Sequence, residues 1–220
     1  MTALAATVIT DRFARAVDYA RIAHAAQVRK GTTIPYLTHL LGVATLVIEH
    51  GGTEDQAIAG LLHDLIEDCG EAHEPIIRAQ FGNAVADIVI ACTDGTVAGK
   101  SAHTTAAAKR ADWLRRKQDY LRHLADSDDA VLLVSACDKL HNALCIVRDL
   151  EDPAVGLAVF DRFTGGRDGT LRYYHALHAT FAARDTGSAP ALDNAISRMH
   201  DIAGAQRQSL AGGNAATHLG

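Results

Sequence analysis

The residues of this sequence best suited to chemistry lie within positions 60–68, where one histidine and three carboxylic acids occur close together. In a helix, Glu67 would lie one turn beyond His63, because residues four positions apart share a face. Asp68 would lie one turn beyond Asp64 for the same reason. Three acids on one helix face repel one another unless a cation or a shared proton offsets the repulsion. A divalent metal ion is the simplest such cation, and the alternative is a solvated, acidic helix end.

Two further residues are candidates for the same site. Asp138 lies in an apolar segment, 130–150, where a lone aspartate is costly unless it is paired or binds a cation. Asn142 would share its helix face, and the alternative role for Asp138 is an ion pair with Lys139. The second candidate is His39, near a predicted helix start, for which the alternative role is structural.

Two imidazoles and two carboxylates make up the candidate metal ligands: His39, His63, Asp64 and Asp138. This donor set suits a borderline divalent ion such as Mn²⁺, Fe²⁺, Co²⁺ or Zn²⁺, and it leaves coordination positions for water and substrate. A metal ion there would lower the pKa of bound water and supply hydroxide at neutral pH. Glu67 and Asp68 would then orient that water and transfer protons.

The elements that must position these residues are predicted to be helices. The chain has 220 residues, many of them alanine and only 4 of them proline, and it lacks a clear alternating strand pattern. Apolar spacing and capping residues predict helices at 11–28, 38–50, 53 through the His-Asp pair, 71–81, 83–93, 105–125, 130–150, from Pro153, 170–183 and 190–203. We therefore predict an all-α fold with one domain over 1–204, a loop at 93–104 and a disordered tail at 205–220.

Charge and cysteine usage narrow the partners and the compartment. The formal net charge is −5 and no basic stripe is present, which argues against a nucleic-acid partner. The four cysteines lack C-x-x-C spacing and are interpreted as reduced thiols. There is no signal-peptide pattern, and no apolar run approaches the roughly 20 residues of a membrane span. We predict a cytoplasmic protein with no membrane partner, and the sequence leaves a homo-oligomer open.

Taken together, the motifs resemble those of the HD-domain metal-dependent phosphohydrolases. The finer pattern is similar to the (p)ppGpp hydrolase domain of RelA/SpoT-type proteins and to the small alarmone hydrolases. The resemblance covers roughly residues 10–150 and is carried by four segments: 23–32, 34–40, 61–68 and 138–142. It implies a single-domain, multi-helix HD-domain phosphohydrolase fold.

The resemblance also implies roles for individual residues. One divalent ion, usually Mn²⁺, would be held by the four candidate ligands named above. Glu67 and Asp68 match the catalytic carboxylates of the family's HDxxED element. Arg29 and Lys30 match cations that contact substrate phosphates, and Asn142 matches an asparagine of the nucleotide pocket. The implied substrate is a phosphorylated guanosine nucleotide: the 3′-pyrophosphate of guanosine tetra- or pentaphosphate is hydrolysed to give GDP or GTP and pyrophosphate.

Two other functions stay open at this stage. The same chemistry could act on another nucleotide, such as the 2′-phosphate of NADPH or a nucleoside monophosphate, because the segment 94–109 is longer and richer in glycine and alanine than the family pattern. The chain could also be a metal-stabilised helical domain that senses a nucleotide without turnover, although the intact set of candidate ligands and carboxylates argues against this. His24 is interpreted as a core histidine, and no region that would synthesise the alarmone is expected.

Overall fold

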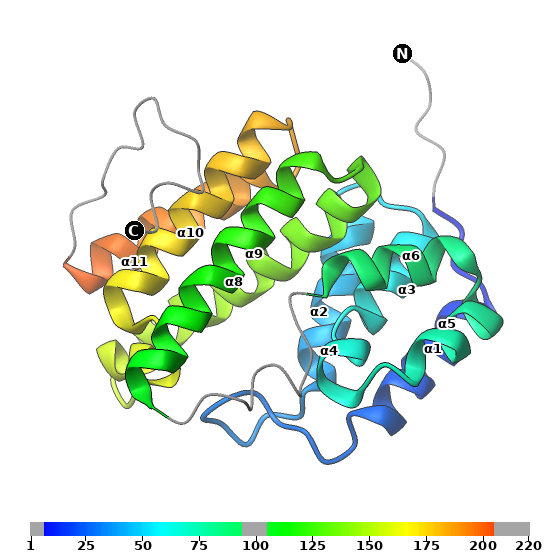
Figure 1. Cartoon of the computed structure of the whole chain (residues 1–220), viewed down its shortest axis with the longest axis horizontal. Helices are drawn as coiled ribbons and strands as arrows, with labels where there is room; N and C mark the ends of the chain where they lie inside the picture. Colours follow the sequence, from blue (N-terminus) through cyan, green and yellow to red (C-terminus); the bar gives the residue numbers. More distant parts are fainter. Residues whose placement is uncertain (1–6, 94–104, 205–220) are drawn as a thin grey trace. The chain divides into compact units, whose positions relative to one another are not determined.

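The computed structural model describes residues 7–93 and 105–204, and its regular elements in these ranges are helices (Figure 1). The one β-pairing in the same ranges is an isolated bridge between Val28 and Pro35. The predicted all-α class is therefore confirmed. The predicted tail and all but the first residue of the predicted loop at 93–104 lie outside the described residues.

The chain divides into two compact units near residue 96. The described residues of the first unit are 7–93, and those of the second are 105–204. The single domain that we expected over 1–204 stays a prediction.

The first unit is built around one short buried helix. Its elements are α1 (Asp11–Ala23), α2 (Leu37–Glu49), α3 (Glu54–Leu62), α4 (Leu65–Cys69), α5 (His73–Phe81) and α6 (Asn83–Cys92). Helix α3 packs against α1, α2 and α6, and its residues from Ala57 to Leu62 are all buried. A methyl group at Gly60 would lie 3.4 Å from the Cα atom of Ala44. The small residue therefore brings the backbones of α2 and α3 close together.

The helix starts in this unit follow the capping residues of the sequence. Thr10 caps α1, and Thr53 forms with Gln56 the capping box that we predicted for α3. The carboxylate of Glu54 accepts hydrogen bonds from the backbone N–H and the hydroxyl of Thr10, at 2.6 and 2.8 Å. Arg12 adds an ion pair with Asp55 at 2.7 Å. These contacts fix the start of α1 to the start of α3.

Helix α1 ends at Ala23, whereas the apolar spacing predicted a helix up to residue 28. The next residues turn back on themselves: the Arg29 N–H donates to the Ile34 carbonyl at 2.8 Å, and the Tyr36 N–H donates to the Gln27 carbonyl at 2.9 Å. We call residues 27–36 the return segment. Its backbone hydrogen bonds use N–H and carbonyl groups that a longer α1 would have paired within the helix. The segment leads directly into α2.

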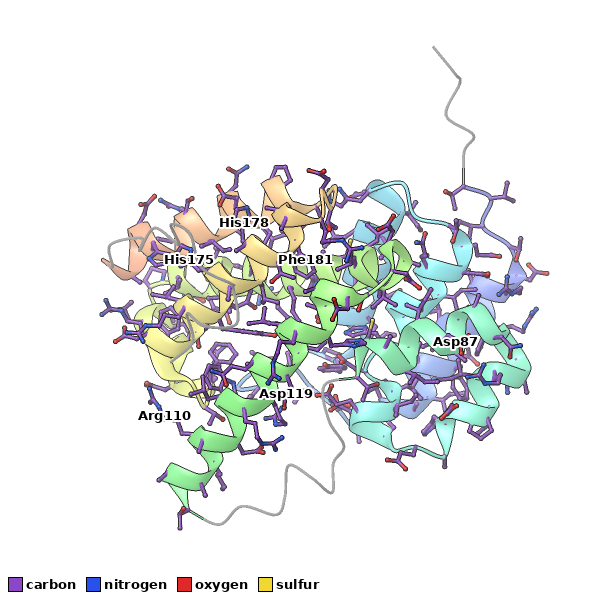
Figure 2. The ribbon with its side chains drawn as sticks, turned by 45° about the horizontal axis from the view of Figure 1, so that its top comes forward. Asp87, Arg110, Asp119, His175, His178 and Phe181 are labelled. Atoms are coloured by element: carbon purple, nitrogen blue, oxygen red, sulfur yellow. The ribbon has the colours of Figure 1, made fainter. Side chains whose placement is uncertain are left out.

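The second unit surrounds one long helix. Its elements are α8 (Ala106–Asp126), α9 (Asp129–Glu151), the 3₁₀ helix η1 (Gly156–Arg162), α10 (Gly166–Ala183) and α11 (Ala189–Ala203). Helix α9 packs against α11, α10 and η1, and it is the buried helix that we predicted. His175 and Phe181 of α10, labelled in Figure 2, are both buried. The short helix expected from Pro153 is the 3₁₀ helix, and α10 begins at Gly166 rather than near Thr170.

By length and composition, one helix in the two described ranges, α9, could cross a membrane. However, 56% of its most apolar window is buried inside the structure. The central helix of a globular protein meets the same criteria, so this is weak evidence for a membrane span.

Helices α8 and α10 approach each other through a tryptophan and two glycines. A methyl group at Gly165 would lie 2.7 Å from the indole ring of Trp113, and one at Gly169 would lie 3.3 Å from it. The edge of the same indole ring meets Tyr173, with ring centroids 6.3 Å apart. The glycines are thus required by the close approach of a large aromatic ring.

We predict that Gly165→Ala lowers the free energy of unfolding by about 1–3 kcal/mol, because the new methyl group overlaps the indole ring. Trp113 is the single tryptophan of the chain, so its fluorescence should shift in the folded variant. Urea denaturation followed by fluorescence measures both effects. The matched control is Gly187→Ala, where a methyl group would meet nothing within 4 Å and stability should change by less than about 0.5 kcal/mol. Equal stabilities of the two variants would contradict the prediction.

Candidate metal centre and catalytic carboxylates

The helix that we expected to carry the whole 60–68 segment is interrupted at the His-Asp pair. Helix α3 ends at Leu62 and α4 begins at Leu65, with Asp64 at φ −92° and ψ 0°. The Nδ1 atom of His63 lies 2.9 Å from the carbonyl oxygen of Gly60. In a continuous helix that carbonyl would accept from the Asp64 N–H. The imidazole therefore occupies a backbone acceptor, and the His-Asp pair sits in the turn between two helices.

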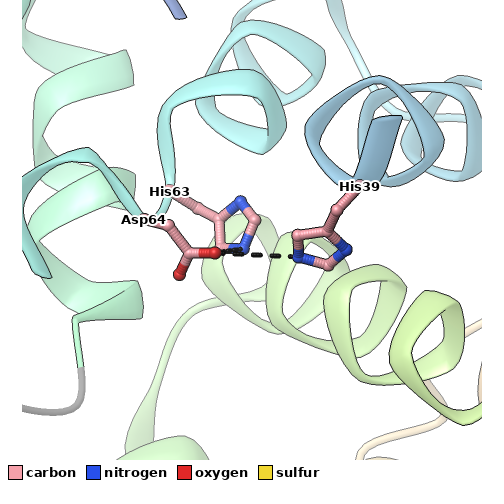
Figure 3. Close-up of side chains that lie close together, drawn as sticks. All are labelled: His39, His63 and Asp64. Atoms are coloured by element: carbon pink, nitrogen blue, oxygen red, sulfur yellow. Dashed lines mark ion pairs between the residues drawn. The ribbon is translucent and has the colours of Figure 1, made fainter. Parts of the chain in front are cut away.

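Three side chains from two helical segments converge in the first unit (Figure 3). The Oδ2 atom of Asp64 lies 3.0 Å from Nε2 of His63 and 3.7 Å from Nε2 of His39. One donor atom from each residue lies within 4.8 Å of the others. Both histidines are buried, at 1% and 3% exposure, while the Asp64 side chain is 17% exposed. The structure thus brings together three of the four predicted ligands.

The protonation of His63 makes this arrangement suited to a cation. The Gly60 carbonyl can only accept a hydrogen bond, so Nδ1 of His63 is the donor and Nε2 carries the lone pair of the neutral ring. That lone pair faces a carboxylate oxygen of Asp64. Two electron-rich atoms at 3.0 Å repel each other unless a proton or a metal ion lies between them. The donor set therefore fits a divalent ion. The hydrogen bond between Nδ1 of His63 and the Gly60 carbonyl orients the imidazole so that Nε2 faces the ion site.

Tyr36 is a site residue that the sequence analysis missed. Its hydroxyl donates to Oδ2 of Asp64 at 2.5 Å, and its ring meets the edge of His39 with centroids 5.5 Å apart. In the sequence it belongs to the segment 34–40, where His39 was the predicted ligand. Its position three residues before His39, at a helix start, is the signal that could have identified it.

The two candidate catalytic carboxylates lie on α4. The Asp68 N–H donates to the carbonyl oxygen of Asp64 at 2.8 Å, so these residues are one turn apart, as predicted, despite the interruption of the helix. Asp68 is exposed, and Glu67 is half-buried. The side chain of Asp68 also accepts a hydrogen bond from Gln27 at 2.7 Å.

The predicted phosphate-binding cations lie in the return segment before α2. The guanidinium carbon of Arg29 lies 5.6 Å from the centroid of the Tyr36 ring, which is a cation–π contact. Arg29 is therefore next to the tyrosine that binds Asp64. Lys30 follows it and is exposed.

Asp138 and Asn142 belong to α9 of the second unit. Asp138 is 6% exposed and accepts hydrogen bonds from Lys139 and Asn142, both at 2.6 Å. The ion pair with Lys139 that we weighed as an alternative is thus present, and Asn142 shares the helix face of Asp138. Burial acts to lower the pKa of Lys139, but the charge and hydrogen bond of Asp138, together with Tyr120 and Tyr173, raise that pKa well above its usual value. The roles of Asp138 as a metal ligand and of Asn142 in substrate binding stay predictions.

The cysteines take no part in the candidate centre. All four lie in the described ranges and none of them forms a disulfide there, in agreement with the expected reduced thiols. Cys69 is the last residue of α4 and directly follows Asp68. Burial raises the pKa of its thiol, and the nearby charges of Asp68 and Asp64 raise it further. The thiol is therefore protonated at neutral pH, a form that neither attacks substrates nor binds metal well.

Comparison with known proteins identifies the family. The family model described as HD domain matches residues 16–171. A Xenopus tropicalis protein named guanosine-3′,5′-bis(diphosphate) 3′-pyrophosphohydrolase MESH1 is 33% identical over 139 residues, which are 62% of this chain and 68% of that protein. A probable GTP diphosphokinase of Arabidopsis thaliana, RSH3, is 31% identical over 56% of this chain and only 16% of its own length. The chain therefore spans about one sixth of some relatives.

Solved structures agree on the fold. A metazoan ortholog of SpoT, described as hydrolysing ppGpp, is 24% identical with a TM-score of 0.65 and covers 91% of this chain and 100% of its own. A protein from Listeria monocytogenes is 26% identical with a TM-score of 0.57, over 76% of this chain and 95% of its own.

The family expected from the motifs is thus confirmed by a match over more than half of the chain. The Xenopus relative supports the same family, because it is 33% identical over 68% of its own length. The chain belongs to the HD-domain family, and within it to the group that contains the Xenopus pyrophosphohydrolase.

Proposed function

We propose that this protein is a metal-dependent phosphohydrolase that removes the 3′-pyrophosphate of guanosine tetra- or pentaphosphate. The observation that carries the proposal is the convergence of two buried imidazoles on the Asp64 carboxylate in a chain of the HD-domain family. The printed activity of the Xenopus relative supports the choice of substrate. The products are GDP or GTP and pyrophosphate.

In this proposal one Mn²⁺ ion is bound by four side chains: His39, His63, Asp64 and Asp138. A bound divalent ion supplies Lewis acidity and lowers the pKa of a coordinated water. The protein contributes the orientation of its ligands. The Gly60 carbonyl holds the ring of His63, and the Tyr36 hydroxyl holds the carboxylate of Asp64.

Hydrolysis adds one water molecule across the bond between the ribose 3′-oxygen and its phosphorus. The water oxygen bonds to phosphorus, the bond to the 3′-oxygen breaks, and that oxygen leaves as a hydroxyl group. Glu67 and Asp68 serve as general base and acid in this step, since they lie one turn beyond the His-Asp pair and are not fully buried.

The substrate carries several negative charges, and the protein has a formal net charge of −5. Local cations must therefore attract the substrate. Arg29 and Lys30 are proposed to contact the phosphates, and Asn142 is proposed to contact the nucleotide. We also propose a cytoplasmic protein whose partner is this nucleotide rather than a nucleic acid or a membrane. Free cysteines are common in that compartment. A homo-oligomer is compatible with the proposal.

The activity test is incubation of the purified protein with ppGpp and Mn²⁺, followed by measurement of GDP and pyrophosphate. We predict turnover by the wild-type protein and at least about 100-fold lower kcat for Glu67→Gln, because the amide cannot accept a proton. The variant should retain its metal. Normal turnover by Glu67→Gln would contradict the assigned proton role.

A nucleotide panel with NADPH and nucleoside monophosphates belongs to the same experiment. If the protein hydrolysed one of these nucleotides, which lack a 3′-diphosphate, faster than ppGpp, that nucleotide would be the better candidate substrate. Tight binding without turnover of any nucleotide would instead favour the nucleotide sensor.

We predict that His63→Ala loses the bound metal and the activity together. Removing one of two imidazole ligands opens the centre and leaves the remaining donors too few to retain the ion. Metal analysis by mass spectrometry after dialysis should find about one ion per wild-type chain and nearly none in the variant. His123→Ala, at an exposed position of α8, is the control and should retain the wild-type metal content. A full complement of metal in His63→Ala would remove this residue from the ligand set.

We predict that Tyr36→Phe weakens metal binding by about 10–100-fold, because it removes the hydroxyl that orients Asp64. Competition with a fluorescent chelator measures the Kd for Mn²⁺. Tyr19→Phe is a matched control in the same unit, since its hydroxyl contacts His73 at 2.7 Å and no predicted ligand. The same Kd in both variants would show that the Tyr36 hydroxyl does not support the centre.

A further inference from the structure

The side-chain amide of Gln27 connects two residues at the end of α1 and on α4. Its Oε1 atom lies 2.6 Å from Nδ1 of His24, and its Nε2 atom donates to Oδ2 of Asp68 at 2.7 Å. The backbone of Gln27 is fixed as well, because its N–H donates to the His24 carbonyl and its carbonyl accepts from the Tyr36 N–H, both at 2.9 Å. The amide therefore reaches Asp68 from an immobilised part of the chain.

The chemistry of these groups allows one orientation of the amide. An ionised carboxylate only accepts hydrogen bonds, so the NH₂ group of Gln27 must face Asp68. Its carbonyl oxygen must then face a donor, which is the Nδ1–H of His24. A flipped amide would place two oxygens against each other at Asp68. The His24 ring thus determines which end of Gln27 reaches the carboxylate.

His24 is itself held in place. It is 4% exposed, and its ring stacks on that of Tyr36 with centroids 5.2 Å apart and an interplanar angle of 27°. The thiol of Cys69 lies 3.8 Å from its Nδ1 atom. The hydroxyl of the same Tyr36 donates to Oδ2 of Asp64. One aromatic pair therefore supports both carboxylates: Asp64 directly through Tyr36, and Asp68 through Gln27.

We propose that Gln27, anchored by His24, is a positioning residue for the Asp68 carboxylate. This inference rests on the proposed function, in which Asp68 takes part in proton transfer. Asp68 is exposed, and an exposed aspartate without a partner samples several rotamers. One hydrogen bond from a fixed amide holds Oδ2 and leaves Oδ1 for the reacting water. An amide does this without adding a positive charge, which would make the carboxylate a weaker base.

The test is Gln27→Met, which keeps the length of the side chain and removes both hydrogen bonds. We expect kcat for ppGpp to fall about 10–100-fold, with KM changed by less than about twofold and bound Mn²⁺ unchanged. Gln80→Met is the control, because Gln80 is exposed on α5, and its kcat should match the wild type. Gln27→Asn keeps an amide that is too short to reach both His24 and Asp68, so it should show the same loss of kcat. It serves as the test variant if Gln27→Met does not fold.

A double-mutant cycle separates positioning from a general structural role. If Gln27 acts through Asp68, Gln27→Met should cause no further loss of kcat in an Asp68→Asn background. Independent, additive losses in the two variants, or wild-type kcat in Gln27→Met, would overturn the inference.

Crystal structures provide a readout that does not depend on the substrate. The Asp68 carboxylate should occupy one position in the wild-type protein and be displaced or spread over several rotamers in Gln27→Met. An unchanged carboxylate would overturn the inference even if ppGpp is hydrolysed. Absence of wild-type turnover with ppGpp would reject the proposed function instead, and the crystallographic comparison would still decide the role of Gln27.

Discussion

The site in the first unit depends on one electrostatic constraint: two buried imidazole nitrogens face the same carboxylate oxygen of Asp64. The ring of His63 directs its other nitrogen at the Gly60 carbonyl, so in the neutral ring the remaining lone pair faces that oxygen. Such an arrangement is stable only with a positive charge between the groups. A divalent ion would satisfy the constraint, and the turn between α3 and α4 places the His-Asp pair where donor atoms of both imidazoles and of Asp64 lie within 4.8 Å of one another.

The rest of the first unit can be understood as the support for this constraint. Gly60 lets α3 approach α2, which carries His39, and its carbonyl orients His63. The return segment 27–36 takes the place of a longer α1 and delivers Tyr36 to Asp64. The contact between Gln27 and Asp68 extends the same scaffold to one of the two candidate catalytic carboxylates. The hydrogen bonds of Asp64 and Asp68 thus come from half-buried side chains of the return segment.

The second unit contains the fourth predicted ligand, the buried aspartate Asp138. Asp138 on α9 is paired with Lys139 and Asn142, so its charge is compensated inside its own helix. An aspartate that accepts from a lysine can still offer its remaining lone pairs to a metal ion. Elsewhere in this unit, the close approach of Trp113 to Gly165 and Gly169 joins α8 to α10. Helix packing therefore stabilises this unit, and neighbours on the same helix pair with its buried aspartate.

The sequence by itself determined the helical class, most helix starts and the types of residue at the site, because helix periodicity, capping and metal-ligand chemistry are local properties. Thr53 and the His63–Asp64 pair could both be identified from neighbours a few positions away. Only the tertiary structure showed that α1 ends at Ala23, that the helix breaks at the His-Asp pair, and that Tyr36 and Gln27 reach the carboxylates. Tyr36 and Gln27 reach partners 28 and 41 positions away in the chain, which local spacing does not predict. The end of α1 and the break at His63 depend on specific turn and side-chain hydrogen bonds, which helix periodicity does not predict either.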